Sequence, residues 1–118
     1  MVNTKKALMK LWKDLFSVVE YQEDVKSNDA DGFKEVTILE NQQCKLSFST
    51  LKEANQNDTG AAVTQVVKLF CDNLIDIKPG SKIIVLRGNQ VFEFSQSGIP
   101  GIFSNHQEIV LIPFQGWA

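Results

Sequence analysis

Gly80, Ser81 and Lys82 are consecutive and could be read as part of a phosphate-binding loop. Such a loop has the order Gly, four spacer residues, then Gly-Lys-Ser/Thr, because several backbone N–H groups must converge on the phosphates while the lysine reaches the outer oxygens. Here serine precedes lysine, and the residue five before Gly80 is Ile75. The following IIVLR is typical of a strand, not of the helix that would hold the anion. Order, spacing and context exclude a phosphate loop.

The same stretch fits a corner between two strands. Pro79 presets its own φ and favours an extended conformation at Lys78, while Gly80 can adopt a positive φ. A second turn signal follows at residues 87–89, Arg-Gly-Asn, and predicts a tight hairpin. We therefore predict that this region is structural.

His106 is the only histidine of the chain and therefore the only imidazole that could act as a general base. Asn105 and Gln107 beside it are poor activators. A triad would need this histidine next to a serine or cysteine and an orienting carboxylate, a geometry that the sequence neither places nor excludes. We favour a loop histidine that makes ordinary hydrogen bonds, and we expect no enzymatic activity.

The cysteines and two acidic loop residues are the remaining candidates for chemistry. Cys44 and Cys71 could form a disulfide only if the fold brought their Cα atoms within about 7 Å, and they are too few for a zinc site. We expect buried free thiols. Asp29 and Asp31 resemble the start of a calcium loop, but one ligand and the glutamate at position twelve are missing, so a plain turn is expected. We predict no metal and no other cofactor.

Composition places the chain among ordinary globular proteins. It has 118 residues, of which 43% are hydrophobic and 22% charged, enough for one hydrophobic core and a single domain over residues 1–118. The net charge of −2 lacks the basic excess typical of nucleic-acid binding. No apolar run reaches the roughly 20 residues of a membrane helix, and residues 1–16 do not resemble a secretory leader. We expect no membrane partner and a cytoplasmic site of synthesis.

The first segment has helical periodicity. Leu8, Leu11, Trp12 and Leu15 fall at i, i+3, i+4 and i+7, which predicts an amphipathic helix over about residues 4–15 with lysines on its other side. A basic amphipathic helix can bind a membrane surface, an acidic partner or DNA phosphates. We favour a helix that docks on its own domain with a solvated lysine face.

From residue 16 onward the apolar period changes to two. Segments such as FKEVTILE, CKLSFST and EIVLIPF, separated by turn residues, predict a small β-barrel of about six or seven antiparallel strands over residues 16–118. Residues 51–62 are almost devoid of apolar side chains and predict a long polar loop, and the Gly- and Pro-containing residues 95–107 predict a second one.

Three segments in this order resemble the small minor capsid and head-closure proteins of tailed phages and prophages of Gram-positive bacteria: LWKDLFSVVEYQE, CKLSFSTL and KLFCDNLIDIKPGSKIIVLRGNQVFEFSQSGIPGIFSNHQEIVL. The resemblance implies a virion protein, assembled in the host cytoplasm, that forms a homo-oligomeric ring closing the head after DNA packaging. Its partners would be copies of itself, the portal or adaptor, and tail-completion proteins. It also implies non-specific contact with packaged DNA, although one lysine and two carboxylates in the polar loop do not favour tight electrostatic capture.

The resemblance and the side-chain types together nominate two groups of residues. A ring needs two different surface patches on each subunit, and large aromatics near chain ends often anchor partners. The alternative is that these aromatics pack into the subunit's own core. The candidate channel loop comprises Lys52, Glu53, Asn55, Gln56, Asn57 and Asp58, and the candidate subunit interface comprises Leu8, Leu11, Trp12, Phe114 and Trp117.

A different class of function is a small β-barrel module that recognises a peptide or ligand. Its binding surface would be formed by the 51–62 and 95–107 loops, since loops of that length in compact domains are commonly functional.

Overall fold

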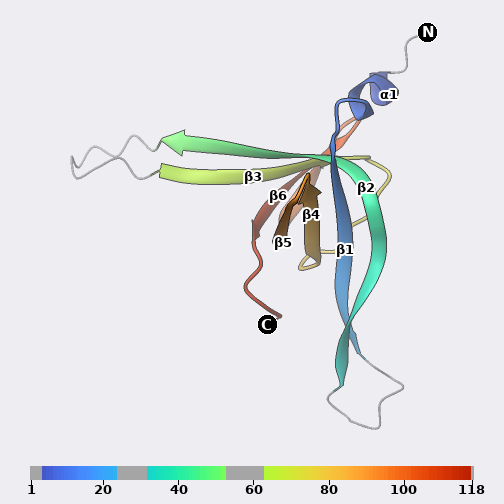
Figure 1. The fold of residues 1–118 in the computed structure, drawn as a ribbon, viewed down its shortest axis with the longest axis vertical. Helices are drawn as coiled ribbons and strands as arrows, with labels where there is room; N and C mark the ends of the chain where they lie inside the picture. The colour runs from blue at the N-terminus through green and yellow to red at the C-terminus, as the bar shows by residue number, and fades with distance from the viewer. Residues whose placement is uncertain (1–3, 24–31, 53–62, 118) are drawn as a thin grey trace, which may run out of the picture.

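A computed structural model describes residues 4–23, 32–52 and 63–117, in which one short helix precedes a closed barrel of six antiparallel strands (Figure 1). The order around the barrel is β1-β2-β3-β6-β5-β4. This confirms the predicted fold class. No helix in the described ranges is long and apolar enough to cross a membrane. The elements are α1 (Thr4–Met9), β1 (Asp14–Glu23), β2 (Phe33–Lys52), β3 (Val63–Cys71), β4 (Lys82–Arg87), β5 (Gln90–Ile102) and β6 (Gln107–Pro113).

The core forms because alternate residues of each strand point into the barrel. On β3, for example, Val67, Leu69 and Cys71 are buried, while the alternating residues Lys68 and Phe70 are partly exposed. Burial of the apolar inner face supplies the main stabilising term. The core cluster consists of Phe16, Val18, Cys44, Leu46, Val67, Leu69, Cys71, Ile77, Ile83, Val85, Phe94, Ile109 and Leu111.

The segments FKEVTILE and CKLSFST are not two strands but one, the 20-residue β2. The strand continues through Asn41, whose φ of 51° lies in the left-handed region that asparagine tolerates better than most residues. The Asn41 N–H donates to Ser17 Oγ at 3.2 Å, and the β1–β2 register shifts nearby, on either side of Val18. This irregularity lets β2 pair first with β1 and then with β3.

Two hairpin ends extend beyond the paired barrel wall (Figure 1). The β1–β4 pairing covers Leu15 to Val19 only, so residues 20–23 and 33–36 pair only with each other among the described residues. We call them the β1–β2 ribbon. In the same way β6 pairs with β3 only from Val67, which leaves residues 49–52 and 63–66 as a β2–β3 ribbon. Each ribbon therefore presents backbone edges with no neighbouring strand in the described chain.

The helix is shorter than predicted: it ends at Met9 instead of residue 15, and β1 begins at Asp14. The chain leaves the helix through two tight turns, in which the Leu11 N–H donates to the Leu8 carbonyl at 3.0 Å and the Trp12 N–H to the Met9 carbonyl at 3.0 Å. No residue of α1 is buried. The apolar period of this segment thus does not produce a packed helical stripe.

The prediction of a loop at residues 95–107 is wrong for most of that segment, because β5 continues to Ile102. The Gly and Pro residues form an irregularity inside the strand: the β5–β6 register shifts between Ser97 and Gly101, and Gly98 has a φ of 76°. A bulge accommodates a positive φ and a proline that lacks an N–H. Only residues 103–106 remain as a connection.

Both predicted turns are confirmed. At the Pro79-Gly80 corner the Ser81 N–H donates to the Lys78 carbonyl at 3.2 Å, and Gly80 has a φ of 82°, the pattern of a type II turn. β4 and β5 are joined by the two residues Gly88 and Asn89.

A partly buried ion pair joins three strands where β1 begins and β4 ends. The Arg87 guanidinium donates from Nε to Asp14 Oδ1 at 3.1 Å and from Nη2 to Asp14 Oδ2 at 3.0 Å. The Leu46 N–H donates to Asp14 Oδ2 at 2.9 Å, and Arg87 Nη2 also contacts the Leu46 carbonyl oxygen. Burial opposes ionisation of Asp14, but the bonds from Arg87 and Leu46 outweigh it and lower the pKa of the carboxyl group.

We predict that Arg87→Met lowers the free energy of unfolding by about 2 kcal/mol in urea denaturation. The value lies below the roughly 3–5 kcal/mol of a fully buried pair because the Arg87 side chain is 40% exposed. The control Lys78→Met changes an exposed lysine and should stay within about 0.5 kcal/mol of the wild type. In the wild type the stabilisation by this ion pair is present above pH 3.8 and is lost as the pH falls through the lowered pKa of Asp14. Equal stability of the two variants would contradict the role of the pair.

Cys44 and Cys71 lie opposite each other on β2 and β3, and both are buried free thiols, as predicted. Burial, followed by the charge of Asp72, raises the pKa of Cys71 to about 12, and burial likewise raises that of Cys44.

We predict that neither thiol reacts with a disulfide reagent at pH 8 in the folded protein and that both react in guanidinium chloride, because the thiolate is the reactive form. Since both folded pKa values exceed the ordinary value of 9.0, their contribution to stability is complete below pH 9 and declines as the pH rises toward 12. Rapid labelling of the native protein would refute this.

Candidate functional site

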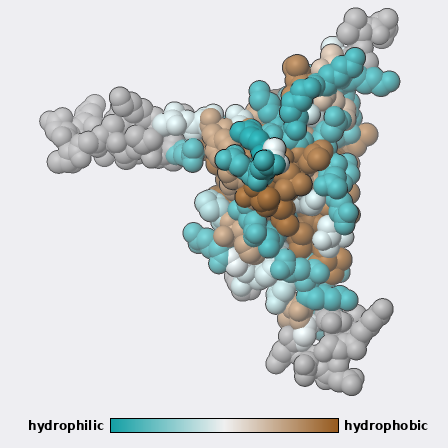
Figure 2. Space-filling view, in the orientation of Figure 1, coloured by the Kyte–Doolittle hydropathy of each residue, from teal (hydrophilic) through white to brown (hydrophobic). Residues whose placement is uncertain are grey.

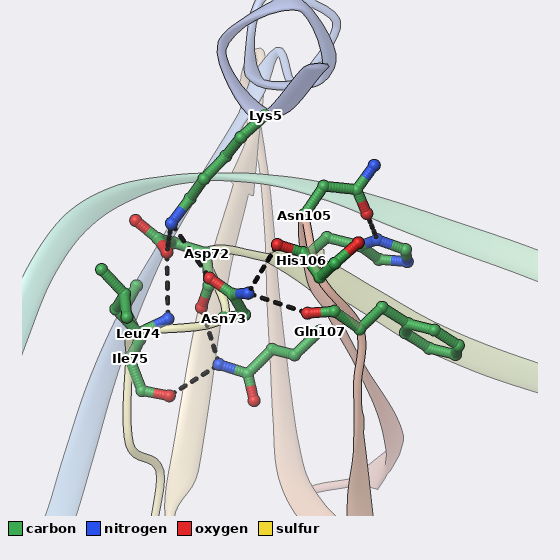
Figure 3. Close-up of polar contacts among 10 residues, drawn as sticks. Lys5, Asp72, Asn73, Leu74, Ile75, Asn105, His106 and Gln107 are labelled. Carbon is green, nitrogen blue, oxygen red and sulfur yellow. Dashed lines mark hydrogen bonds and ion pairs between the residues drawn. The ribbon is translucent and has the colours of Figure 1, made fainter. Parts of the chain in front are cut away.

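A polar network around residues 72–75 and 103–107 contacts α1 (Figure 3). Lys5 Nζ lies 2.7 Å from Asp72 Oδ1 and donates to Asn73 Oδ1 at 2.9 Å. Asp72 Oδ1 also accepts the Leu74 N–H at 3.0 Å. Although burial favours the neutral acid, the bonds from Lys5 and Leu74 together with the Lys5 charge lower the pKa of Asp72. An ionic contact from Lys5 therefore helps to anchor a helix in which no residue is fully buried.

Two amides extend this network to the connections at residues 72–75 and 103–106. Asn73 Nδ2 donates to the carbonyl oxygens of Phe103 at 2.8 Å and Ser104 at 3.2 Å. The buried Gln107 donates from Nε2 to the carbonyls of Asp72 at 2.7 Å and Ile75 at 2.6 Å (Figure 3). The two partly buried Gln107 bonds satisfy carbonyls that would otherwise be costly to bury. Together with the Asn73 bonds they hold both connections in one arrangement.

His106 makes the ordinary hydrogen bonds that the sequence predicts. Its Nδ1 lies 2.7 Å from Asn105 Oδ1 and its Nε2 lies 3.0 Å from Glu108 Oε2. The ring stacks on Phe103 with centroids 4.8 Å apart, and Glu108 also lies 3.7 Å from Lys68 Nζ. Both ring nitrogens face oxygen atoms of an amide and a carboxylate, and neither contacts a serine or cysteine in the described part of the chain.

The C-terminal aromatics pack on the β1–β2 ribbon. Trp117 stacks on Tyr21 with centroids 5.0 Å apart, and Tyr21 stacks on Phe33 at 5.3 Å. Phe114 meets Trp117 edge-on, and Lys82 Nζ lies 4.6 Å above the Phe114 ring. Phe114 and Trp117, both nominated for a subunit interface, are thus half-buried against their own chain.

The other nominated interface residues have different environments. Trp12 is only 3% exposed and lies with the half-buried Leu8 beside Lys45, Phe70 and His106, whereas Leu11 is 67% exposed. Of the five nominated residues, Leu11 is the one that the structure leaves largely open to a partner.

The candidate channel loop lies beyond the end of the β2–β3 ribbon. Lys52 is the last residue of β2 and its backbone pairs with Val63. The rest lie outside the described residues, namely Glu53, Asn55, Gln56, Asn57 and Asp58.

The sequence analysis missed an apolar groove between residues 73–79 and the irregular part of β5. Leu74, Ile99 and Ile102 line it and are 82%, 95% and 68% exposed. The isolated isoleucines among Gly and Pro in GIPGI were the available signal, but the stretch was interpreted as a loop. Figure 2 shows further apolar side chains interspersed with polar ones on the visible face of the barrel.

Comparison with known proteins shows a shared fold. No protein-family model matches the chain, and no curated protein matches it in sequence. Among solved structures it is similar to the phage-like element PBSX protein xkdH of Bacillus subtilis, with a TM-score of 0.54 and 11% identity. The match covers 86% of this chain and 95% of that one. At this identity the likeness shows a common fold over nearly the whole length of both chains.

We predict that Lys5→Met releases α1 from the barrel, because it removes the contacts to Asp72 and Asn73. Hydrogen exchange of the Lys10 N–H, which donates to the Lys6 carbonyl at 3.2 Å, should increase several-fold while β3 and β6 keep their protection. Lys13→Met, which leaves the anchor intact, is the control. In the wild type the same release is expected as the pH falls through the lowered pKa of Asp72. Unchanged exchange in Lys5→Met would show that other contacts hold the helix.

Proposed function

We propose that the protein is a structural component of a tailed-phage or prophage particle. In this proposal it forms part of the head-tail connector ring that closes the head after DNA packaging and offers a surface for tail attachment. The observation that carries the proposal is the fold that this chain shares with a protein of a phage-like element over 95% of that protein's length. The ordered sequence resemblance to head-closure proteins supports it independently.

The β2–β3 ribbon supports a role for the polar segment that it carries. Its residues 49–52 and 63–66 pair with each other and with no further described strand. An isolated two-stranded ribbon has only marginal stability in water. The ribbon is therefore best suited to an assembly in which neighbouring molecules contact it, and the channel-blocking loop of our proposal begins at its end.

A ring also requires surfaces that a monomer leaves uncovered. Exposed large apolar side chains occur at Leu11, Leu74, Ile99 and Ile102, on separate segments of the chain. Two different patches on one subunit are what a closed, head-to-tail ring needs. The proposed partners are thus other copies of the protein, the portal or adaptor, and tail-completion proteins, with non-specific contact to packaged DNA.

The alternative of a ligand-binding module has less support. It relied on two long loops, 51–62 and 95–107, and β5 occupies the second as far as Ile102. In the proposed role the protein acts by assembly and not by catalysis. The hydrogen bonds of the His106 ring to Asn105 and Glu108 are consistent with that role.

We predict that deleting residues 55–59 leaves the barrel folded, because the deletion removes no residue of the strands that the structure describes. The resulting particles should assemble and then lose packaged DNA, which nuclease protection of purified particles would measure. His106→Ala is the comparison variant, and its particles should keep their DNA and infectivity. Full DNA retention after the deletion would argue against channel closure by this segment, and loss of infectivity in a folded His106→Ala protein would argue against a non-catalytic role.

A further inference from the structure

The apolar groove has the dimensions and lining of a docking site. Its volume is about 410 Å³, and it lies between the 73–79 segment and the irregular part of β5. Leu74, Ile99 and Ile102 project their side chains at its edge, with Ile99 exposed to 95%. Apolar side chains this exposed and this close together are typical of surfaces that another chain covers.

The charges around the groove indicate which segment could bind in it. Asp76 lines the groove, is exposed and forms no ion pair with any described residue, and no lysine or arginine is among the lining residues. The exposed Leu11 lies between Lys10 and Lys13, both of which are also exposed. This segment combines an apolar side chain with two cations, which complements an apolar groove with one free carboxylate.

We propose that the groove binds the Lys10–Lys13 segment of a second copy of the protein, with Leu11 inserted between Leu74 and Ile99. Within one chain this contact is absent, since Leu11 is largely exposed and no residue of 4–13 lines the groove. Groove and segment are different surfaces, so the contact is head-to-tail and can repeat around a ring. The inference rests on the proposed ring and names its subunit contact.

The test uses single-cysteine additions, because the native thiols are buried. Leu11→Cys protein and Ile99→Cys protein are mixed at high concentration and treated with a short bismaleimide. Leu11→Cys mixed with Val91→Cys is the matched control, as Val91 is 61% exposed and does not line the groove. We expect several-fold more heterodimer from the Leu11–Ile99 mixture. Equal yields from the two mixtures would overturn the contact.

Charge reversal tests the electrostatic part. Asp76→Lys in the Ile99→Cys protein should lower the heterodimer yield about two- to fivefold, in line with exposed ion pairs. Lys10→Glu and Lys13→Glu in the Leu11→Cys protein should restore it.

Purified particles separate this inference from the proposed function. In particles that carry Leu11→Cys together with Ile99→Cys, cross-linking should produce a ladder of multimers of this chain. Particles that contain the protein but give no ladder, or that link Ile99→Cys to a different protein, would overturn the contact and leave the proposed function standing. Absence of the protein from particles would overturn the proposed function, and the solution experiment would then decide the contact alone.

Discussion

The salt bridge between Asp14 and Arg87 is the constraint on which the barrel's geometry depends. Backbone pairing between β1 and β2 ends at Asp14, and beyond it the carboxylate accepts the Leu46 N–H in place of a further β1 residue. Arg87, the last residue of β4, neutralises that carboxylate and contacts the Leu46 carbonyl. The Asp14–Arg87 pair thus links β1, β2 and β4 at the point where backbone pairing between β1 and β2 ends. Beyond this point β2 continues into the β2–β3 ribbon, of which it is one strand.

A second polar network holds α1 and the connections at residues 72–75 and 103–106. Lys5, Asn73 and Gln107 donate to loop oxygens from three different segments, and together they set the positions of α1 and of both connections. No residue of α1 is fully buried, so this network and the buried Trp12 together determine where the Leu11 segment leaves the molecule. The same contacts fix residues 72–75, which form one side of the apolar groove.

This arrangement separates a rigid barrel from surfaces that remain available for assembly. The core residues and the two polar networks are satisfied within the chain, whereas the backbone edges of the ribbons, Leu11 and the groove are left uncovered by the described residues. A small protein whose unpaired edges and apolar side chains lie on several sides is suited to a position between other subunits. The proposed connector role accounts for these features together, and the groove supplies a specific subunit contact within it.

The sequence by itself determined the barrel class, the Pro79-Gly80 corner, the Gly88-Asn89 hairpin and the buried thiols, because alternation and turn chemistry are local properties. It failed where local signals were ambiguous: GIPGI was interpreted as a loop although sheet pairing absorbs it as a bulge, and Trp12 continued a helical pattern although the chain turns after Met9. Only the tertiary structure brought Asp14 to Arg87, Lys5 to Asp72 and Leu74 into a groove with Ile99. Those contacts join residues far apart in the sequence, and their distances follow from strand register and barrel closure, which no short segment encodes.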